Sequence, residues 1–253
     1  MPAKSTKPES TPHTNAWLAF EQNLDSISHM VYLGGREIRL LKAEATRLSN
    51  LEIGDLTKKA NEAKLIRSIK RFSKTTQARL ERYGTVNLWQ VVMLVTCIEA
   101  YLQDLLSIAA SVDPELMSKS QQLAPYADVI AATSLADLAN DLRARWARGW
   151  LSDGGPTRWI SRLERMGARG YPDDLAPRME LIWGIRHAVV HTAGVATKDF
   201  VKRYPGVVKA AGDRLRVGSK DYGTFLDAVK GFMEPTEQFF LARYPSLLAA
   251  AGK

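Results

Sequence analysis

The residues of this chain that are best suited to chemistry are one arginine and two histidines at close spacing. Arg186, His187 and His191 lie in the stretch Arg-His-Ala-Val-Val-His. On a helix, with about 100° between successive residues, all three fall in one sector, and Arg186 and His191 are about 7.5 Å apart along the axis. An imidazole with a pKa near neutrality can transfer protons, and a guanidinium stabilises developing negative charge. The set could therefore act on a phosphate held between Arg186 and His191.

A structural role is the alternative for the same three residues. Arg186 would then pair with a buried carboxylate, and the histidines would lie at a subunit contact. An arginine and a histidine five positions apart occur often by chance, so the spacing alone favours this structural interpretation.

A helix over residues 173–194 is predicted to position these side chains. Asp174 is suited to the N-cap, Pro177 falls in the first turn, and Gly194 is a natural left-handed stop. One side of this helix is apolar and is predicted to face the core: Leu175, Leu181, Ile182, Ile185, Ala188 and Val189. The other sector carries the candidate site, with Glu180, Trp183, Arg186, His187, Val190, His191 and Gly194.

The segment Arg186–His191 resembles the signature of the HEPN superfamily. That signature is an arginine, usually followed by a polar residue, with a histidine after four to six intervening residues. Residues 94–105, with Glu99, resemble the earlier helix of that family and its acidic residue. A glycine, a short basic and β-prone stretch and a final amphipathic helix follow the motif in the order of the family. The resemblance covers about residues 85–245, with one departure, because His187 stands where asparagine or aspartate is commoner.

This resemblance implies an all-α, HEPN-like helical bundle that cleaves RNA without a metal. Members of the family dimerise so that two arginine–histidine sets share a cleft. By that resemblance His191 would transfer protons, Arg186 would clamp the phosphate, and His187 would position the substrate or assist. We also expect Glu99 to pair with Arg186 and hold its guanidinium in place; the alternative is that this pair only stabilises the fold.

The corresponding functional expectation is a homodimeric endoribonuclease, a prokaryotic toxin or defence effector with RNA as its substrate and a cognate antitoxin or regulatory protein as a further partner. Two alternatives stay open. The first is a non-catalytic HEPN module that binds RNA or a nucleotide. The second is a dimeric helical scaffold that keeps the motif for association only.

The sequence predicts neither a cofactor nor a metal site. His187 and His191 stand four apart, which is metal-ligand spacing on a helix. No glutamate of the His-Glu-x-x-His type lies between them, and no third ligand is evident in the sequence.

Composition favours a polyanionic partner. The chain of 253 residues carries 35 Lys and Arg against 27 Asp and Glu, a net charge of +8 with a pI near 9.6. Cys97 is the single cysteine and lies in an apolar stretch, which predicts a reduced packing thiol. Without a secretory segment or an uncharged run of spanning length, we expect a soluble cytoplasmic protein that does not associate with membranes.

The predicted organisation is a polar, disordered tail over residues 1–14, N-terminal helices with a basic segment over 15–84, the HEPN-like domain over 85–245 and a C-terminal tail over 246–253. Helices are expected at 15–33 and 36–48, separated by Gly34-Gly35. Gly84 is expected to separate the basic segment from an apolar helix over 87–111 that begins with a capping box of Asn87 and Gln90. The basic segment carries the candidate RNA-binding residues Lys64, Arg67, Lys70 and Arg71. Its alternative is a solvated helix with extended lysines.

The C-terminal part of the chain is predicted to hold shorter elements. Helical connections are expected over 135–150, with Trp146 and Trp150 facing the core rather than stacking on bases, and a short helix over 157–167. A helical turn over 199–204 and a small strand or hairpin over 215–220 precede a last helix over 222–243, kinked near Pro235.

Overall fold

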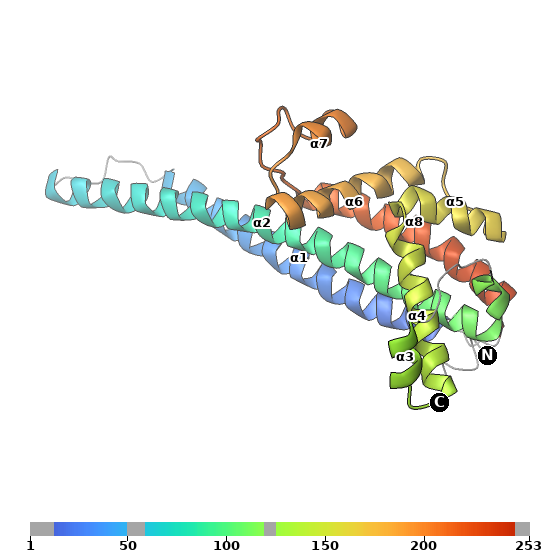
Figure 1. Ribbon diagram of the computed structural model, residues 1–253. Helices are drawn as coiled ribbons and strands as arrows, with labels where there is room; N and C mark the ends of the chain where they lie inside the picture. The colour runs from blue at the N-terminus through green and yellow to red at the C-terminus, as the bar shows by residue number, and fades with distance from the viewer. Residues whose placement is uncertain (1–12, 50–58, 119–124, 246–253) are drawn as a thin grey trace, which may run out of the picture. The chain divides into compact units, whose positions relative to one another are not determined.

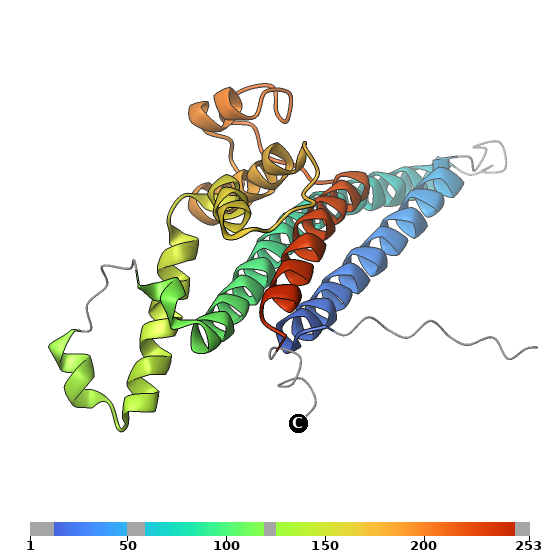
Figure 2. The same cartoon turned by 90° about the vertical axis from the view of Figure 1, so that its right-hand side faces the viewer.

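The computed structural model describes residues 13–49, 59–118 and 125–245 of the chain, and within them the side chains of most residues between 30 and 85 lie outside the description. The described elements are α1 (Asn15–Ser49), α2 (Lys59–Val112), a short 3-10 turn η2 (Pro114–Met117), α3 (Tyr126–Ala131), α4 (Leu135–Ser152), α5 (Gly155–Met166), α6 (Leu175–Thr192), α7 (Lys198–Arg203) and α8 (Ser219–Arg243). Figures 1 and 2 show them from two directions. Within these ranges every regular element is helical and no strand occurs, which confirms the predicted all-α class.

The two helix breaks predicted at glycines are wrong. α1 continues through Gly34-Gly35, and α2 continues through Gly84, so that one helix of 54 residues replaces the predicted basic segment and apolar helix. A glycine in a helix interior costs about 1 kcal/mol relative to alanine, which weakens a helix without ending it. Such residues stay helical wherever the helix on both sides is stable.

The apolar stripe predicted on the second half of α2 is confirmed. Its members are at most 2% exposed: Val91, Val95, Ile98, Leu102, Leu105 and Ala109. Cys97 is also buried, and burial raises the pKa of its thiol, which suits a packing role. The stretch Val86–Val112 is long and apolar enough to cross a bilayer. Half of its most apolar part is buried, and a buried core helix can have the same length and composition.

The capping box predicted for Asn87 and Gln90 does not form, because both residues lie in the interior of α2. The side-chain amide of Asn87 instead donates to the carbonyl oxygen of Val217 at 2.7 Å. Gln90 is buried, with 3% of its surface exposed. Asn87, predicted as a helix cap, therefore serves a contact to another element instead.

The described chain divides into two compact units whose limits differ from the predicted boundary between residues 84 and 85. The first unit contains the chain up to residue 23, residues 97–177 and the chain from residue 228. The second contains residues 24–96 and 178–227. Helices α1, α2, α6 and α8 each contribute to both units.

In the first unit a buried carboxylate anchors the start of α1. Thr14 donates to the Glu237 carboxylate from its backbone N–H at 2.7 Å and from its hydroxyl at 3.1 Å, and the Tyr101 hydroxyl donates to the same carboxylate at 2.8 Å. Thr14 also caps α1, because its hydroxyl oxygen accepts from the N–H of Trp17 at 3.1 Å. The ring of His13 stacks on Trp17 at 4.9 Å. His13 and Thr14, predicted to belong to the disordered tail, are thus part of this packing.

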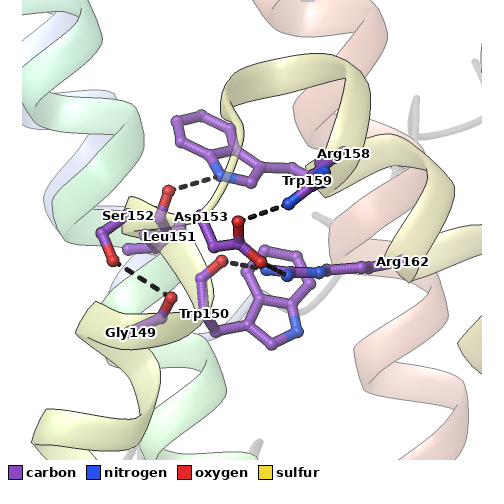
Figure 3. A network of polar contacts seen from close by, with 8 residues as sticks. All are labelled: Gly149, Trp150, Leu151, Ser152, Asp153, Arg158, Trp159 and Arg162. Atoms are coloured by element: carbon purple, nitrogen blue, oxygen red, sulfur yellow. Dashed lines mark hydrogen bonds and ion pairs between the residues drawn. The ribbon is translucent and has the colours of Figure 1, made fainter.

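The first unit also contains a polar junction between α4 and α5 (Figure 3). The carboxylate of Asp153 pairs with both Arg158 and Arg162. Arg162 also donates to the carbonyl oxygen of Trp150, and its guanidinium lies 5.4 Å from the centre of the Trp150 indole. Trp146 and Trp150 are half-buried. The Trp150 ring is thus engaged by an arginine of its own chain.

Two further contacts organise this unit. Asp128 of α3 pairs with Arg145 of α4, and Figure 2 shows these two helices side by side. α8 continues as a helix through Pro235, and the hydroxyl of Tyr171 lies 3.0 Å from that of Thr236, one residue later. The spacing along this helix predicts four inward residues, Phe225, Val229, Phe232 and Phe239; the first three are buried, and Phe239 is half-buried.

Candidate functional site

The central helix forms as the sequence predicts. α6 begins at Leu175, directly after Asp174, and Pro177 is its third residue. The predicted core face is buried except for the half-buried Leu181: Leu175, Ile182, Ile185, Ala188 and Val189. The helical period therefore separates a packed side from the side that carries the arginine and the histidines.

The C-terminal end of α6 is left-handed at two residues. Gly194 has a φ of 77°, as expected of a glycine stop, and Ala193 has a φ of 52°. The Gly194 N–H donates to the carbonyl oxygen of Ala188 at 2.9 Å, which satisfies one of the last helical carbonyls. Gly194 also lies close to Leu88 of α2, whose Cδ1 would be 3.3 Å from an added Cβ. This turn therefore sets the direction in which the chain leaves the site.

The three candidate residues of α6 lie at or near the surface. His187 and His191 are exposed, and their ring centres are 4.5 Å apart. Arg186 is half-buried, and its guanidinium lies 5.4 Å from the centre of the half-buried Trp183 ring. This contact restricts the guanidinium while leaving part of it accessible. Neither imidazole is enclosed by hydrophobic packing.

The electrostatic surroundings favour the neutral form of His187. Partial burial lowers the pKa of His187, and the neighbouring His191 and Arg186 lower it further because a second positive charge nearby is unfavourable. At pH 7 a neutral imidazole can accept a proton, which is what a general base requires.

The last residue of α7, Arg203, and the residue after it, Tyr204, contact α6. The hydroxyl of Tyr204 donates to the carbonyl oxygen of Glu180 at 2.8 Å, and Arg203 pairs with the Glu180 carboxylate at 3.0 Å. The ring of Tyr204 occupies the space where a Cβ of Gly184 would be, since its Cε2 would be 2.3 Å from that atom. Close packing therefore requires glycine at position 184. Glu180, which the helical period places on the same face as the candidate site, contacts Arg203 and Tyr204. We call these contacts the α6–α7 clasp.

The chain between α7 and α8 returns to the end of α6 in extended form. Val195 and Arg214 form an isolated antiparallel bridge, and the N–H of Leu215 donates to the carbonyl oxygen of Gly194 at 2.8 Å. Leu215 and Val217 are buried, whereas Arg214 and Arg216 are exposed. The strand or hairpin predicted over 215–220 is thus a single extended segment from about 213 to 217 that pairs with the residues after α6.

The described contacts do not test the remaining predicted site residues. Glu99 is half-buried in α2 and belongs to the first unit, whereas Arg186 belongs to the second, so the Glu99–Arg186 pair stays a prediction. The side chains of Lys64, Arg67, Lys70 and Arg71 lie outside the described residues, although their backbone is helical. Among the described side chains, no group of three His, Cys, Asp or Glu gathers as a metal site would require.

The sequence interpretation missed several residues around the site. Tyr204 and Arg203 act through contacts with α6 that lie about twenty positions away in sequence and leave no local pattern. Arg214 and Arg216 could have been found, because the alternation of arginine with Leu215 and Val217 is typical of an extended segment with one buried side.

Comparison with models of known protein families, with curated proteins and with solved structures finds no match for this chain. The function of this chain is therefore inferred from its residues and their geometry, together with the resemblance of the motif.

Proposed function

We propose that this protein is a metal-independent endoribonuclease that acts as a homodimer, with its site on the exposed face of α6. The observation that carries the proposal is the placement of Arg186, His187 and His191 on one accessible helix face, with both imidazoles exposed. The resemblance of this segment to the HEPN signature supports the same activity. A toxin or defence role in a prokaryotic cytoplasm is the setting that the resemblance favours.

The proposed reaction is attack of a ribose 2′-hydroxyl on the adjacent phosphorus. The 2′-oxygen forms a bond to phosphorus while the bond to the 5′-oxygen breaks, and the products are a 2′,3′-cyclic phosphate and a 5′-hydroxyl end. One proton leaves the 2′-hydroxyl and one reaches the departing 5′-oxygen, so two proton-transfer groups are needed. His191 is the proposed proton-transfer residue, with His187, whose pKa is lowered, as an auxiliary base.

Arg186 is the proposed phosphate clamp. An arginine guanidinium is positively charged and can donate two parallel hydrogen bonds to phosphate oxygens. The contact with Trp183 restricts its motion, which reduces the entropy lost when it binds a phosphate. Arg186 would therefore stabilise the charge that develops on the phosphorane.

A second copy of the chain would complete the site. One arginine and two histidines on one helix face are few groups for binding, deprotonation and protonation. Val190, between the two histidines in sequence, is 45% exposed, so the same face offers an apolar side chain that a second α6 could cover. Two facing sets would then share a single cleft.

The decisive experiment compares wild-type protein with a His191→Ala variant on a labelled RNA in the presence of EDTA. We expect wild type to cleave with formation of a 2′,3′-cyclic phosphate end. The variant should be about 10²- to 10⁴-fold slower, which is the usual contribution of a positioned proton-transfer group. A His29→Ala variant, which removes an exposed histidine of α1, is the matched control and should cleave like wild type.

Two outcomes would contradict the proposal. Equal cleavage by wild type and His191→Ala would remove the activity from this site, and no cleavage by wild type, with RNA binding retained, would favour the non-catalytic alternative. Sedimentation equilibrium tests the dimer. A protein that is monomeric at every concentration at which it is active would exclude the shared cleft.

A further inference from the structure

We propose that Arg214 and Arg216 form a second phosphate-binding element that holds the RNA strand next to the α6 site. This inference rests on the proposed function, because it takes a ribonucleotide strand as the ligand. It adds a binding surface contributed by a different segment, the extended chain that precedes α8.

The backbone pairing at the end of α6 places this element. The hydrogen bond from Leu215 N–H to Gly194 O fixes the extended segment beside the residue that ends the helix, three positions after His191. A second bond, from Ala196 N–H to Asp213 O at 2.9 Å, fixes the register on the other side of the Val195–Arg214 bridge. All of these residues belong to the same compact unit as Arg186, His187 and His191.

In this extended segment the side chains of the two arginines lie on the solvent side. Successive side chains of an extended chain point to opposite sides, so the burial of Leu215 (3% exposed) and Val217 (4% exposed) leaves Arg214 and Arg216 on the solvent side. The hydrogen bond from Asn87 to Val217 O anchors the far end of the segment to α2. The backbone that carries the two arginines is therefore hydrogen-bonded at both of its ends, to the residues after α6 and to α2.

The nearby acidic residues are engaged by backbone amides. The Asp213 carboxylate accepts from the N–H of Ala210 at 2.9 Å, and the Asp221 carboxylate accepts from the N–H of Gly218 at 2.8 Å. Among the described residues, no hydrogen bond or ion pair engages the guanidinium groups of Arg214 and Arg216. They are thus available to an external anion, and a chain of phosphates is the anion that suits two arginines at alternate positions.

The test measures binding separately from cleavage. The probe is a fluorescent 2′-O-methyl RNA oligonucleotide, which cannot be cleaved because the attacking 2′-oxygen is blocked. Binding to the full chain is followed by anisotropy at several salt concentrations. The Arg214→Gln/Arg216→Gln variant should bind about tenfold more weakly at 0.1 M salt, and the slope of log K against log salt should fall by about 1.4, since each contact to a single strand contributes about 0.7.

The matched control is Lys198→Gln/Lys202→Gln, which removes the same charge from two exposed positions of α7 in the same unit. This control should lose less than about twofold in affinity, with little change in slope, if position rather than net charge decides binding. Circular dichroism melts should show that both variants fold, because Leu215 and Val217 are unchanged.

The outcomes separate this inference from the proposed activity. Wild type that binds the probe through the arginine pair but does not cleave unmodified RNA would contradict the nuclease and support the binding element. Equal losses in the two double variants, an unchanged salt slope in the arginine variant, or no binding of the probe by wild type would each overturn the inference.

Discussion

At the scale of single residues, the surroundings of His187 favour one of its two protonation states. Partial burial, His191 and Arg186 all favour the neutral form of His187. His187 also occupies the position where the resembled family more often carries asparagine or aspartate. A neutral imidazole there keeps the hydrogen-bonding capacity of a polar residue and adds the ability to accept a proton.

The protonation of His187 can be followed by NMR of the histidine rings. We expect a titration midpoint below the ordinary pKa of about 6.5. A His191→Ala substitution should raise the midpoint because one neighbouring positive charge is removed, but only in part, since burial and Arg186 remain. The resonance is assigned by its loss in a His187→Gln variant. His29→Ala should leave the midpoint in place, and a midpoint at or above 6.5 would contradict the effect of these neighbours.

At the scale of elements, the clasp between α6 and α7 explains why a glycine lies in the middle of the site helix. Alanine has the higher helix propensity by about 1 kcal/mol, so an isolated helix would gain from a Gly184→Ala change. The ring of Tyr204 reverses this, because its Cζ and hydroxyl oxygen would each lie 2.5 Å from the new Cβ.

Gly184→Ala should therefore destabilise the protein. The ring must shift and lose its hydrogen bond to the Glu180 carbonyl oxygen, and we expect the free energy of unfolding in urea to fall by about 1–3 kcal/mol. Gly223→Ala in α8 is the matched control, because an added Cβ there meets nothing within 4 Å, and it should be neutral or stabilising. A Tyr204→Ala background should abolish the cost of Gly184→Ala. An unchanged cost there would show that the ring is not the cause.

At the scale of the whole molecule, the first unit depends on a carboxylate that joins the start of α1 to α2 and α8. Glu237 is 2% exposed and accepts from the backbone and hydroxyl of Thr14, 223 positions earlier, and from Tyr101. A buried hydrogen-bonded group of this kind is costly to remove, because its partners are left buried without an acceptor.

Glu237→Leu should lower the free energy of unfolding by about 2–4 kcal/mol, measured by urea denaturation. Glu234→Leu, an exposed position of α8, should change it by less than about 0.5 kcal/mol. A double-mutant cycle with Tyr101→Phe should show a coupling of about 1 kcal/mol. Similar effects of the two glutamate variants, or additive effects of Glu237→Leu and Tyr101→Phe, would show that the Glu237 carboxylate does not join these helices.

Local pattern in the sequence was sufficient for the helical class, the buried stripe of α2, the two sides of α6 and the stop at Gly194. Each of these follows from side-chain periodicity or from the backbone freedom of one residue, and both are properties of neighbours along the chain. The same local rules failed at Gly34, Gly35 and Gly84, because a glycine weakens a helix by an amount that the flanking residues can offset.

Only the tertiary structure decided the partners of Asn87, Gly184 and Glu237 and the position of Arg214 and Arg216 beside the end of α6. These contacts join residues from about 20 to more than 200 positions apart, and no spacing rule applies over such distances. The physical reason is that burial and hydrogen bonding select partners by proximity after packing. The sequence could therefore identify Arg186 and His191 as candidate site residues, whereas the arrangement of the surface around them depended on tertiary packing.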